Sequence, residues 1–262
     1  MNPMRDRLTI ETAMVLSAGL GTRMRPITDS IPKPLVEVHG KTLLDRALDA
    51  LAAGGVRRCF VNVHYLAEQI EAHLEPRTAP QILISDERQE LLDSGGGVKK
   101  AILDEPNGPI LILNGDSFWV DGQQANIDAI NAAWNPDAMD MLLLVASAEQ
   151  AVGFDGPGDF FMNPQGQLTR RGEAPSAPFI YAGAIVTTID FLRSIAEAKF
   201  SLNQLFDTAI QQNRLYGLPL DGLWLHVGTP ASIAEAEQAI DQYTARTAAT
   251  GATAPNQPNQ PN

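Results

Sequence analysis

Short apolar runs alternate with amphipathic stretches along the first half of the chain. The apolar runs cover residues 13–17, 59–63, 81–85, 109–114 and 141–146. Runs of this length are typical of strands that are covered on both faces of a sheet. Between the first two runs, apolar residues recur at helical spacing from Leu43 to Leu51, and Gly54 and Gly55 follow as a stop signal. The alternation predicts an α/β fold: a three-layer α/β/α sandwich around a mostly parallel, Rossmann-like sheet, with ligands beyond the carboxyl ends of the strands.

The second half of the chain departs from this alternation after about Gly153. Shorter strands with glycine or proline turns are predicted within residues 153–168 and 179–188, and helical patterns follow at 189–197 and 202–213. We interpret this half as a smaller, β-rich lid on the edge of the sheet.

The pattern divides the chain into three parts. Residues 1–12 form an N-terminal extension, and residues 13–243 form one folded domain that divides near residue 150. The last predicted helix runs from about Pro230 to Tyr243. Residues 244–262 have almost no large apolar side chains and end in a proline-asparagine-glutamine repeat, so we predict a disordered tail there.

Charge and composition narrow the function classes. The chain has 262 residues, of which 44% are hydrophobic, and a formal charge of −12. This length is sufficient for a substantial core. The acidic field argues against binding to nucleic acid or to anionic membranes, because their phosphates would be repelled. An anionic ligand therefore requires a local basic patch, and residues 12–36 supply one, with Arg23, Arg25 and Lys33 against Asp29.

Cysteine content and the apolar runs indicate the compartment. Cys59 is the only cysteine in the sequence, which excludes an intrachain disulfide framework and a thiolate metal cluster. The first residues lack the apolar core of a signal peptide, and no apolar run reaches the ~18 residues of a membrane span. We therefore expect a cytoplasmic protein without membrane or nucleic-acid partners.

A glycine-rich turn follows the first predicted strand, in the sequence LSAGLGTRMRPITDSIPKPL. Gly19 and Gly21 precede a short predicted helix, where backbone N–H groups can wrap a phosphate oxygen. Arg23 and Arg25 carry guanidinium groups suited to phosphate, and Lys33 lies between two prolines that stiffen its setting. The alternatives are a tight turn without a ligand and basic side chains that are only solvated. The dinucleotide fingerprint and the Walker A pattern are both absent from the sequence.

The turn and the PKPL run together resemble the signature of the sugar nucleotidyltransferase family. The matching residues are Gly19, Gly21, Thr22 to Pro26 and Pro32 to Leu35, and the resemblance extends from about Ala13 to Ala239. Within the family the chain is similar to the short bacterial N-acetylmuramate 1-phosphate uridylyltransferases, which share its compact length and its SGGG run. It has none of the hexapeptide repeats of the long bifunctional members, so no acetyltransferase domain is expected.

This resemblance implies the nucleotide-diphospho-sugar transferase fold. It also implies transfer of UMP from UTP to N-acetylmuramate 1-phosphate, with release of pyrophosphate, in cell-wall recycling. Residues 13–150 would bind the nucleotide, and residues 151–243 would bind the sugar and close the site. The attacking phosphate oxygen is already anionic, so positioning and charge neutralisation are expected to dominate catalysis. We expect a monomer or a weak homodimer.

Roles for particular residues also follow from the resemblance. Catalysis would depend on Arg23, Lys33 and Asp116. Nucleotide binding would involve Ala18, Gly19, Gly21, Thr22, Arg23, Lys33, Gly95, Gly96 and Gly97. Sugar binding would involve Asn114, Asp159, Glu173, Ala182 and Gly183. Taken alone, the SGGG glycines could also be a flexible entry to a helix that begins near Val98, and Asp159 and Glu173 could be solvated loop carboxylates.

Two positions bear on a metal ion. Asp116 follows the buried run 109–114, where an α/β sheet places its ligands, and the resemblance identifies it with the family's metal aspartate. Mg²⁺ prefers such oxygen ligands, and Mn²⁺ is the second choice. Where the family commonly has a second aspartate, this chain has His226, in WLHVGT. The alternatives for His226 are a direct ligand of a softer metal, a partner of metal-bound water, a phosphate contact and a core histidine.

Two other interpretations remain. The same chemistry with other substrates would use mannose 1-phosphate with GTP, a heptose phosphate, or phosphocholine with CTP. Alternatively, the chain is a nucleotide-binding regulatory protein that lost its activity when the metal aspartate became His226. Intact Gly21, Arg23, Lys33 and Asp116 favour an enzyme.

Overall fold

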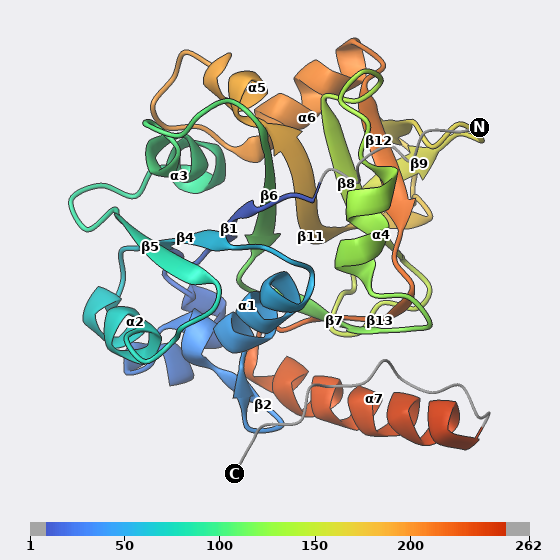
Figure 1. The fold of residues 1–262 in the computed structure, drawn as a ribbon. Helices are drawn as coiled ribbons and strands as arrows, with labels where there is room; N and C mark the ends of the chain where they lie inside the picture. The colour runs from blue at the N-terminus through green and yellow to red at the C-terminus, as the bar shows by residue number, and fades with distance from the viewer. Residues whose placement is uncertain (1–8, 250–262) are drawn as a thin grey trace, which may run out of the picture.

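Four neighbouring parallel strands form one side of the sheet. In the computed structural model, which describes residues 9–249, these strands are β5 (Gln81–Asp86), β4 (Arg58–Val63), β1 (Thr12–Leu16) and β6 (Pro109–Asn114), in that spatial order (Figure 1). β1 is central, with Val15 opposite both Val61 and Leu113. The first four predicted strands are thus confirmed, and their carboxyl ends meet at one edge.

Antiparallel pairing extends the sheet beyond β6. β11 (Phe179–Thr188) runs antiparallel to both β6 and β8 (Met141–Ser147), and β12 (Leu215–Pro219) completes that side parallel to β8. The short strand β9 (Phe160–Met162) pairs with the start of β11, and β10 (Leu168–Arg170) pairs with β9. We predicted residues 179–188 in an edge lid, but β11 lies inside the nine-stranded sheet because its apolar residues are buried on both faces.

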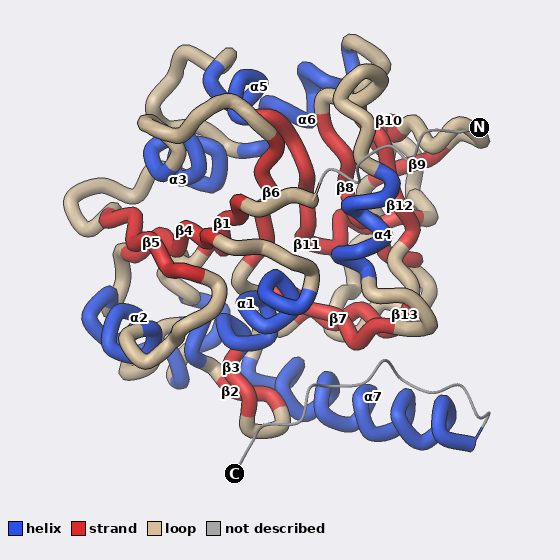
Figure 2. The backbone as a smooth tube through the Cα atoms, in the orientation of Figure 1, coloured by secondary structure: helices blue, strands red, loops and turns tan. Residues whose placement is uncertain are grey.

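Helices cover both faces of the sheet, as the alternating pattern predicts (Figure 2). One face packs against α1 (Leu43–Ala53), α2 (Ala67–Leu74) and α4 (Asn126–Ala133). The other face packs against α3 (Asp93–Ala101), α5 (Ile189–Arg193) and α6 (Leu202–Gln211). Successive residues of β1 supply the two cores, with Val15 in the first and Met14 in the second, so the three-layer sandwich is confirmed.

Helix α1 shows how local signals fix an element. The Oγ1 of Thr42 accepts a hydrogen bond from the backbone N–H of Asp45 at 2.9 Å, which caps the helix N-terminus. The apolar residues predicted to recur at helical spacing are all buried. Gly54 is the C-cap of the helix, and only glycine fits there because a Cβ would lie 2.1 Å from Ile127 Cγ2 on α4.

A separate apolar cluster lies below the sheet. It joins the ribbon of β7 (Ser117–Asp121) and β13 (Gly222–His226) to the hairpin of β2 (Glu37–Val38) and β3 (Lys41–Thr42) and to α7 (Pro230–Ala249). Figure 2 shows the backbone of these elements at the same side of the molecule. The β7–β13 ribbon is antiparallel and pairs Ser117 with His226. This ribbon begins shortly after β6, so it continues from the edge where the strands end.

Helix α7 continues beyond its predicted end at Tyr243. The apolar stripe stops there, but residues 244–249 include three alanines and an arginine, which favour helix, and each added residue gains a backbone hydrogen bond. The Thr247 hydroxyl donates to the carbonyl of Tyr243 at 3.1 Å. The prediction of a disordered tail was therefore wrong for residues 244–249, and its remainder, like residues 1–8 of the predicted extension, lies outside the described residues. Within residues 9–249, no helix is long and apolar enough to cross a membrane.

Candidate active site

Two adjoining cavities open at the carboxyl edge of the parallel strands. The first has a volume of about 550 Å³ and is lined by the end of β1, the turn after it and the end of β6. The second, of about 500 Å³, lies between that edge and the β7–β13 ribbon. Both are lined by Arg23, Asn114, Asp116 and Gly228. The position agrees with the expectation that ligands lie beyond the carboxyl ends of the strands.

The glycine turn brings two cations to the first cavity. Gly21 adopts a φ of +62°, and a Cβ there would lie 3.0 Å from both Lys33 Cβ and Thr28 Cγ2. Only glycine satisfies both the conformation and the space. The turn leads into the short 3₁₀ helix η1 (Thr22–Met24), which carries Arg23, and the Thr28 hydroxyl donates to the Gly21 carbonyl at 2.8 Å.

The structure gathers most of the predicted nucleotide residues around the first cavity. Its lining includes Ala18, Gly19, Gly21, Thr22, Arg23 and Lys33. Arg25 is different, because it pairs with Asp29 at 3.2 Å on the surface, with 62% of its side chain exposed. Of the two arginines in the basic patch, only Arg23 therefore faces the cavities.

Lys33, which lines the first cavity, forms an ion pair with Asp116, which lines both cavities. The Nζ of Lys33 donates to Oδ2 of Asp116 at 2.9 Å, and the lysine is held in the 3₁₀ helix η3 (Lys33–Leu35) with 12% of its side chain exposed. Burial alone would raise the pKa of Asp116, but Lys33, His226 and Arg23 outweigh it and hold that pKa below its ordinary value. Asp116 is therefore an ionised carboxylate near neutral pH and can bind a cation.

A divalent metal fits this site only with help from a substrate. Within residues 9–249, no group of three or more histidine, cysteine, aspartate or glutamate side chains could hold a metal ion. Mg²⁺ is commonly bound by one or two carboxylates together with phosphate oxygens, and Asp116 at the cavity wall matches that donor set.

His226 lines the second cavity near Asp116. Its ring lies parallel to that of Trp224, with an interplanar angle of 15° and centroids 6.2 Å apart. Burial, with Lys33 and Arg23, lowers the pKa of His226 against the opposing effect of Asp116. The imidazole is therefore neutral at pH values near 7, which disfavours a phosphate contact as imidazolium. Gly228 leaves room for the ring, because a Cβ there would lie 2.6 Å from Nε2 of His226.

The three glycines of the SGGG run lie inside α3 rather than before it. The helix begins at Asp93, not near Val98 as we predicted, because Gly95 and Gly96 both donate their N–H groups to the Phe200 carbonyl and pack directly against that segment. A Cβ at Gly95 would lie 2.3 Å from the Phe200 ring. The glycines are buried and do not line the first cavity, whose wall is formed instead by the preceding residues Leu91, Asp93 and Ser94.

Two of the predicted sugar residues, Asn114 and Asp159, line the second cavity. Asp159 accepts the backbone N–H of Tyr181 at 2.9 Å. Ala182 and Gly183 lie behind the wall: the Ala182 carbonyl accepts Trp224 Nε1–H at 2.8 Å, and a Cβ at Gly183 would lie 2.2 Å from the Ser117 hydroxyl. Glu173 is exposed and lines neither cavity.

An aromatic wall in the second cavity had no sequence signal. It is formed by Phe154, Tyr181 and Trp224. Aromatic residues usually indicate core, and only the tertiary arrangement shows that these three line a cavity. Ser17 and Asn62, at the ends of β1 and β4, were likewise missed in the first cavity, although their place after apolar runs offered a signal.

Comparisons with known proteins agree with this geometry. The chain matches the nucleotidyl transferase family model over residues 12–154. It is 42% identical to the N-acetylmuramate alpha-1-phosphate uridylyltransferase of Caulobacter vibrioides, over 86% of this chain and 95% of that relative. The identity to the enzyme of the same name from Neisseria meningitidis serogroup B is 31%, over 86% of this chain and 96% of that relative.

Solved structures show the same fold. HddC from Yersinia pseudotuberculosis, complexed with GMP-PN, aligns with a TM-score of 0.70 and 19% identity, covering 88% of this chain and all of that one. A UDP-glucose pyrophosphorylase complexed with UDP-glucose aligns with a TM-score of 0.72 and 14% identity, covering 89% and 99%. The family model and the 42% identical relative confirm the predicted family, and the glycine turn and the PKPL run lie at the first cavity: the chain belongs to the nucleotidyl transferase family.

Proposed function

We propose that this protein transfers UMP from UTP to N-acetylmuramate 1-phosphate, giving UDP-N-acetylmuramate and pyrophosphate. The observation that carries the proposal is the 42% identity to an N-acetylmuramate alpha-1-phosphate uridylyltransferase over nearly the full length of both chains. The two adjoining cavities are consistent with it, because the reaction brings two phosphate-bearing substrates together. The cationic side chain of Arg23 lines both cavities. A reaction that consumes UTP also supports a cytoplasmic location.

The two cavities suggest how the substrates lie. The first cavity, with the glycine turn and Arg23, would hold the nucleoside triphosphate. The second, with its aromatic wall and Asp159, would hold the sugar, since rings pack on sugar faces and a carboxylate accepts hydroxyl or amide hydrogens. The reacting phosphates would then meet at the shared wall, beside Arg23 and Asp116.

Side-chain acid–base chemistry is not required for the transfer. A phosphate oxygen of the sugar 1-phosphate attacks the α-phosphorus of UTP, a new P–O bond forms, and the bond to the β-phosphate oxygen breaks as pyrophosphate leaves with the electron pair. No proton is transferred in this step. Lys33, which lines the first cavity beside Asp116, would stabilise the negative charge that develops on the α-phosphate.

A divalent cation, Mg²⁺ in preference to Mn²⁺, would be held by Asp116 together with substrate phosphates. When bound, it would neutralise phosphate charge. The Asp116 carboxylate would then have two cationic neighbours, and Lys33 would be free to turn toward the α-phosphate. His226, neutral and beside Asp116, is proposed to act through water rather than as a direct ligand.

Pyrophosphate release is the decisive measurement. The protein is incubated with Mg²⁺, each of the four ribonucleoside triphosphates and, in turn, N-acetylmuramate 1-phosphate, N-acetylglucosamine 1-phosphate, mannose 1-phosphate, a heptose phosphate and phosphocholine. We expect the highest kcat/KM with UTP and N-acetylmuramate 1-phosphate. A preference for GTP with mannose 1-phosphate would move the protein to a different substrate within the same chemistry. Nucleotide binding without pyrophosphate release from any pair would support the regulatory interpretation.

A further inference from the structure

A row of three buried polar residues crosses the carboxyl ends of three parallel strands. Ser17 follows β1, Asn62 lies at the end of β4, and Glu87 follows β5. Their exposed fractions are 2%, 3% and 1%. Burying a carboxylate is unfavourable unless its oxygens are hydrogen-bonded, so the contacts of Glu87 indicate what this arrangement does.

The hydrogen bonds within this row of polar residues all run in one direction, because each residue donates to the next, from Ser17 to Asn62 to Glu87. The Ser17 backbone N–H donates to Oδ1 of Asn62 at 2.7 Å, and Nδ2 of Asn62 donates to Oε1 of Glu87 at 2.7 Å. The other Glu87 oxygen accepts the Leu92 N–H at 3.1 Å. Among the described residues, Glu87 has no basic partner within ion-pair distance, and its oxygens accept only from amides. An acceptor-only carboxylate fixes the Asn62 amide with its oxygen toward Ser17.

Gly97 is shaped around this contact. A Cβ at Gly97 would lie 2.6 Å from Oε1 of Glu87 and 3.0 Å from Nδ2 of Asn62. The last glycine of the SGGG run therefore makes room for a hydrogen bond between two other residues. An apolar pair at these two positions would pack without burying polar atoms that need partners, so stability alone does not account for Glu87.

One polar atom of this group lacks a partner. The Ser17 hydroxyl is buried, makes no hydrogen bond, and belongs to a residue that lines the first cavity. Asn62 lines the same cavity. A buried hydroxyl without a partner is destabilising, and it becomes satisfied if a ligand in the cavity supplies an acceptor or donor.

We propose that Glu87, acting through the Asn62 amide, is a positioning residue that holds the start of the glycine turn for nucleotide binding, and that the Ser17 hydroxyl contacts the bound nucleotide directly. The inference rests on the proposed function, since it takes the first cavity as the nucleoside triphosphate site. It assigns to three residues outside the family signature a role in binding one substrate and not the other.

A pair of substitutions that exchanges the amide and the carboxylate tests the positioning role. In Asn62→Asp, two carboxylates face each other, so the turn loses its anchor, and we expect the Kd for UTP to rise about tenfold. Adding Glu87→Gln reverses the donor and the acceptor, because the new amide can donate to the new carboxylate while its oxygen still accepts from Leu92. We expect the double variant to return to within about threefold of the parent. Glu87→Gln alone keeps one acceptor and should weaken binding by about threefold or less.

Binding is measured by calorimetry with UTP and Mg²⁺ and no sugar phosphate, alongside the melting temperature. Asn126→Asp is the matched control: Asn126 is 1% exposed and donates to the Asp121 carboxylate at 2.7 Å, but lines neither cavity. It should lower the melting temperature as Asn62→Asp does and leave the Kd unchanged. An unchanged Kd in folded Asn62→Asp, or a double variant as weak as the single one, overturns the positioning role.

Ser17→Ala tests the direct contact even if the variants at position 62 fold poorly. Removing an unsatisfied buried hydroxyl should keep or raise the melting temperature, whereas the Kd for UTP should rise about fivefold. KM for the sugar phosphate should not change in steady-state assays. Equal UTP affinity in Ser17→Ala and the parent removes the hydroxyl from the site. If the parent itself binds none of the four ribonucleoside triphosphates, the proposed function fails along with the inference, and the two failures are thereby distinguished.

Discussion

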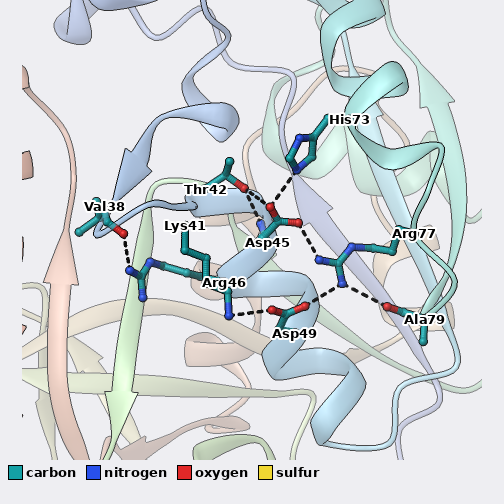
Figure 3. A network of polar contacts seen from close by, with 9 residues as sticks. All are labelled: Val38, Lys41, Thr42, Asp45, Arg46, Asp49, His73, Arg77 and Ala79. Atoms are coloured by element: carbon teal, nitrogen blue, oxygen red, sulfur yellow. Dashed lines mark hydrogen bonds and ion pairs between the residues drawn. The ribbon is translucent and has the colours of Figure 1, made fainter. Parts of the chain in front are cut away.

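The pKa values of Asp116 and Asp45 are both lowered, but Asp116 borders two open cavities whereas Asp45 is surrounded by hydrogen-bond donors of the protein. Asp45, on α1, accepts from Arg77 at 2.6 Å, from the Thr42 hydroxyl at 2.8 Å and from His73 at 2.9 Å (Figure 3). Burial would raise the pKa of Asp45, but these partners outweigh it and lower that pKa, as Lys33 does for Asp116. Around Asp45, cations and acceptors satisfy one another, whereas Asp116 borders two cavities.

The contrast shows that a lowered pKa does not identify an active site by itself. In the Asp45 cluster, Arg77 also binds Asp49 and the Ala79 carbonyl, so its donors are used within the protein, as Figure 3 shows. At Asp116, the cations Lys33 and Arg23 face open space that a phosphate can occupy. The two clusters therefore differ in their cations. Those beside Asp116 can still donate to a ligand, whereas the donors of Arg77 beside Asp45 are used within the protein.

The largest effect is expected from Lys33→Ala. Because its charge would be most useful on the transition-state phosphate, we expect kcat to fall about 10³-fold and the Kd for UTP to change only modestly. Lys41→Ala is the matched control, since Lys41 pairs with Asp49 at 2.7 Å beside the Asp45 cluster and should leave kcat unchanged. Steady-state pyrophosphate release measures both, and equal rates in the two variants would remove Lys33 from the mechanism.

Asp116→Asn should lower activity by about 10²-fold at low Mg²⁺, with partial recovery as Mg²⁺ is raised, because a neutral amide binds the cation more weakly. The measurement is the rate as a function of Mg²⁺ concentration. A Mg²⁺ dependence identical to that of the parent would make Asp116 a partner of Lys33 only.

Asp45→Asn should affect stability and leave chemistry alone. We expect a loss of about 1–2 kcal/mol near pH 7 in urea unfolding, with unchanged kcat. Since the folded-state pKa of Asp45 lies below its unfolded value of about 3.9, its contribution is fully present above that value and is lost as pH falls through the folded pKa. The difference between variant and parent should therefore shrink on acidification, and a difference that grows would contradict the assignment.

His226→Asp should have a small effect on rate and a larger one on metal preference. If His226 acts through water, the parent is active with Mg²⁺ and the variant keeps or tightens its use of Mg²⁺. Rates with Mg²⁺ and Mn²⁺ for both proteins decide this. A parent that is inactive with Mg²⁺ and active with Mn²⁺, with the preference reversed in the variant, would make His226 a direct ligand.

The smallest effect is expected from Arg25→Ala. Its pair with Asp29 is exposed on both sides, so the change in stability should stay below about 0.5 kcal/mol and kcat/KM should not change. Arg23→Ala, two residues away, should raise KM for UTP by about tenfold or more. If the two substitutions have similar effects, the contrast between a cation that is paired on the surface and a cation that faces the cavities is wrong.

Much of the architecture could be predicted because burial on both faces leaves a direct trace in the sequence. The apolar runs of β1, β4, β6 and β8 are such traces, whereas β5 lies at the edge of the sheet and is only partly buried. Strand order leaves none, so β11 was placed at the edge although it pairs with β6 inside the sheet.

Around the cavities, the residues set by backbone conformation were the predictable ones. Gly21 and its neighbours form a continuous motif, and they line the first cavity. The SGGG glycines were misplaced because a glycine required by close packing against Phe200 or Glu87 looks the same in sequence as one that admits a ligand. The aromatic wall depends on residues that are distant in sequence, and no local pattern reports it.

The wall common to both cavities has a thermodynamic consequence. Since Arg23 and Asp116 face each cavity, a ligand in one alters the field felt by a ligand in the other. Linkage then requires the coupling to be reciprocal: whatever factor the nucleotide imposes on the affinity for the sugar phosphate, the sugar phosphate imposes on the nucleotide. Two anions that share one guanidinium would weaken each other's binding. A cation that arrives with the first anion would make each strengthen the binding of the other, so the sign of the coupling depends on what the Arg23 and Asp116 side chains hold.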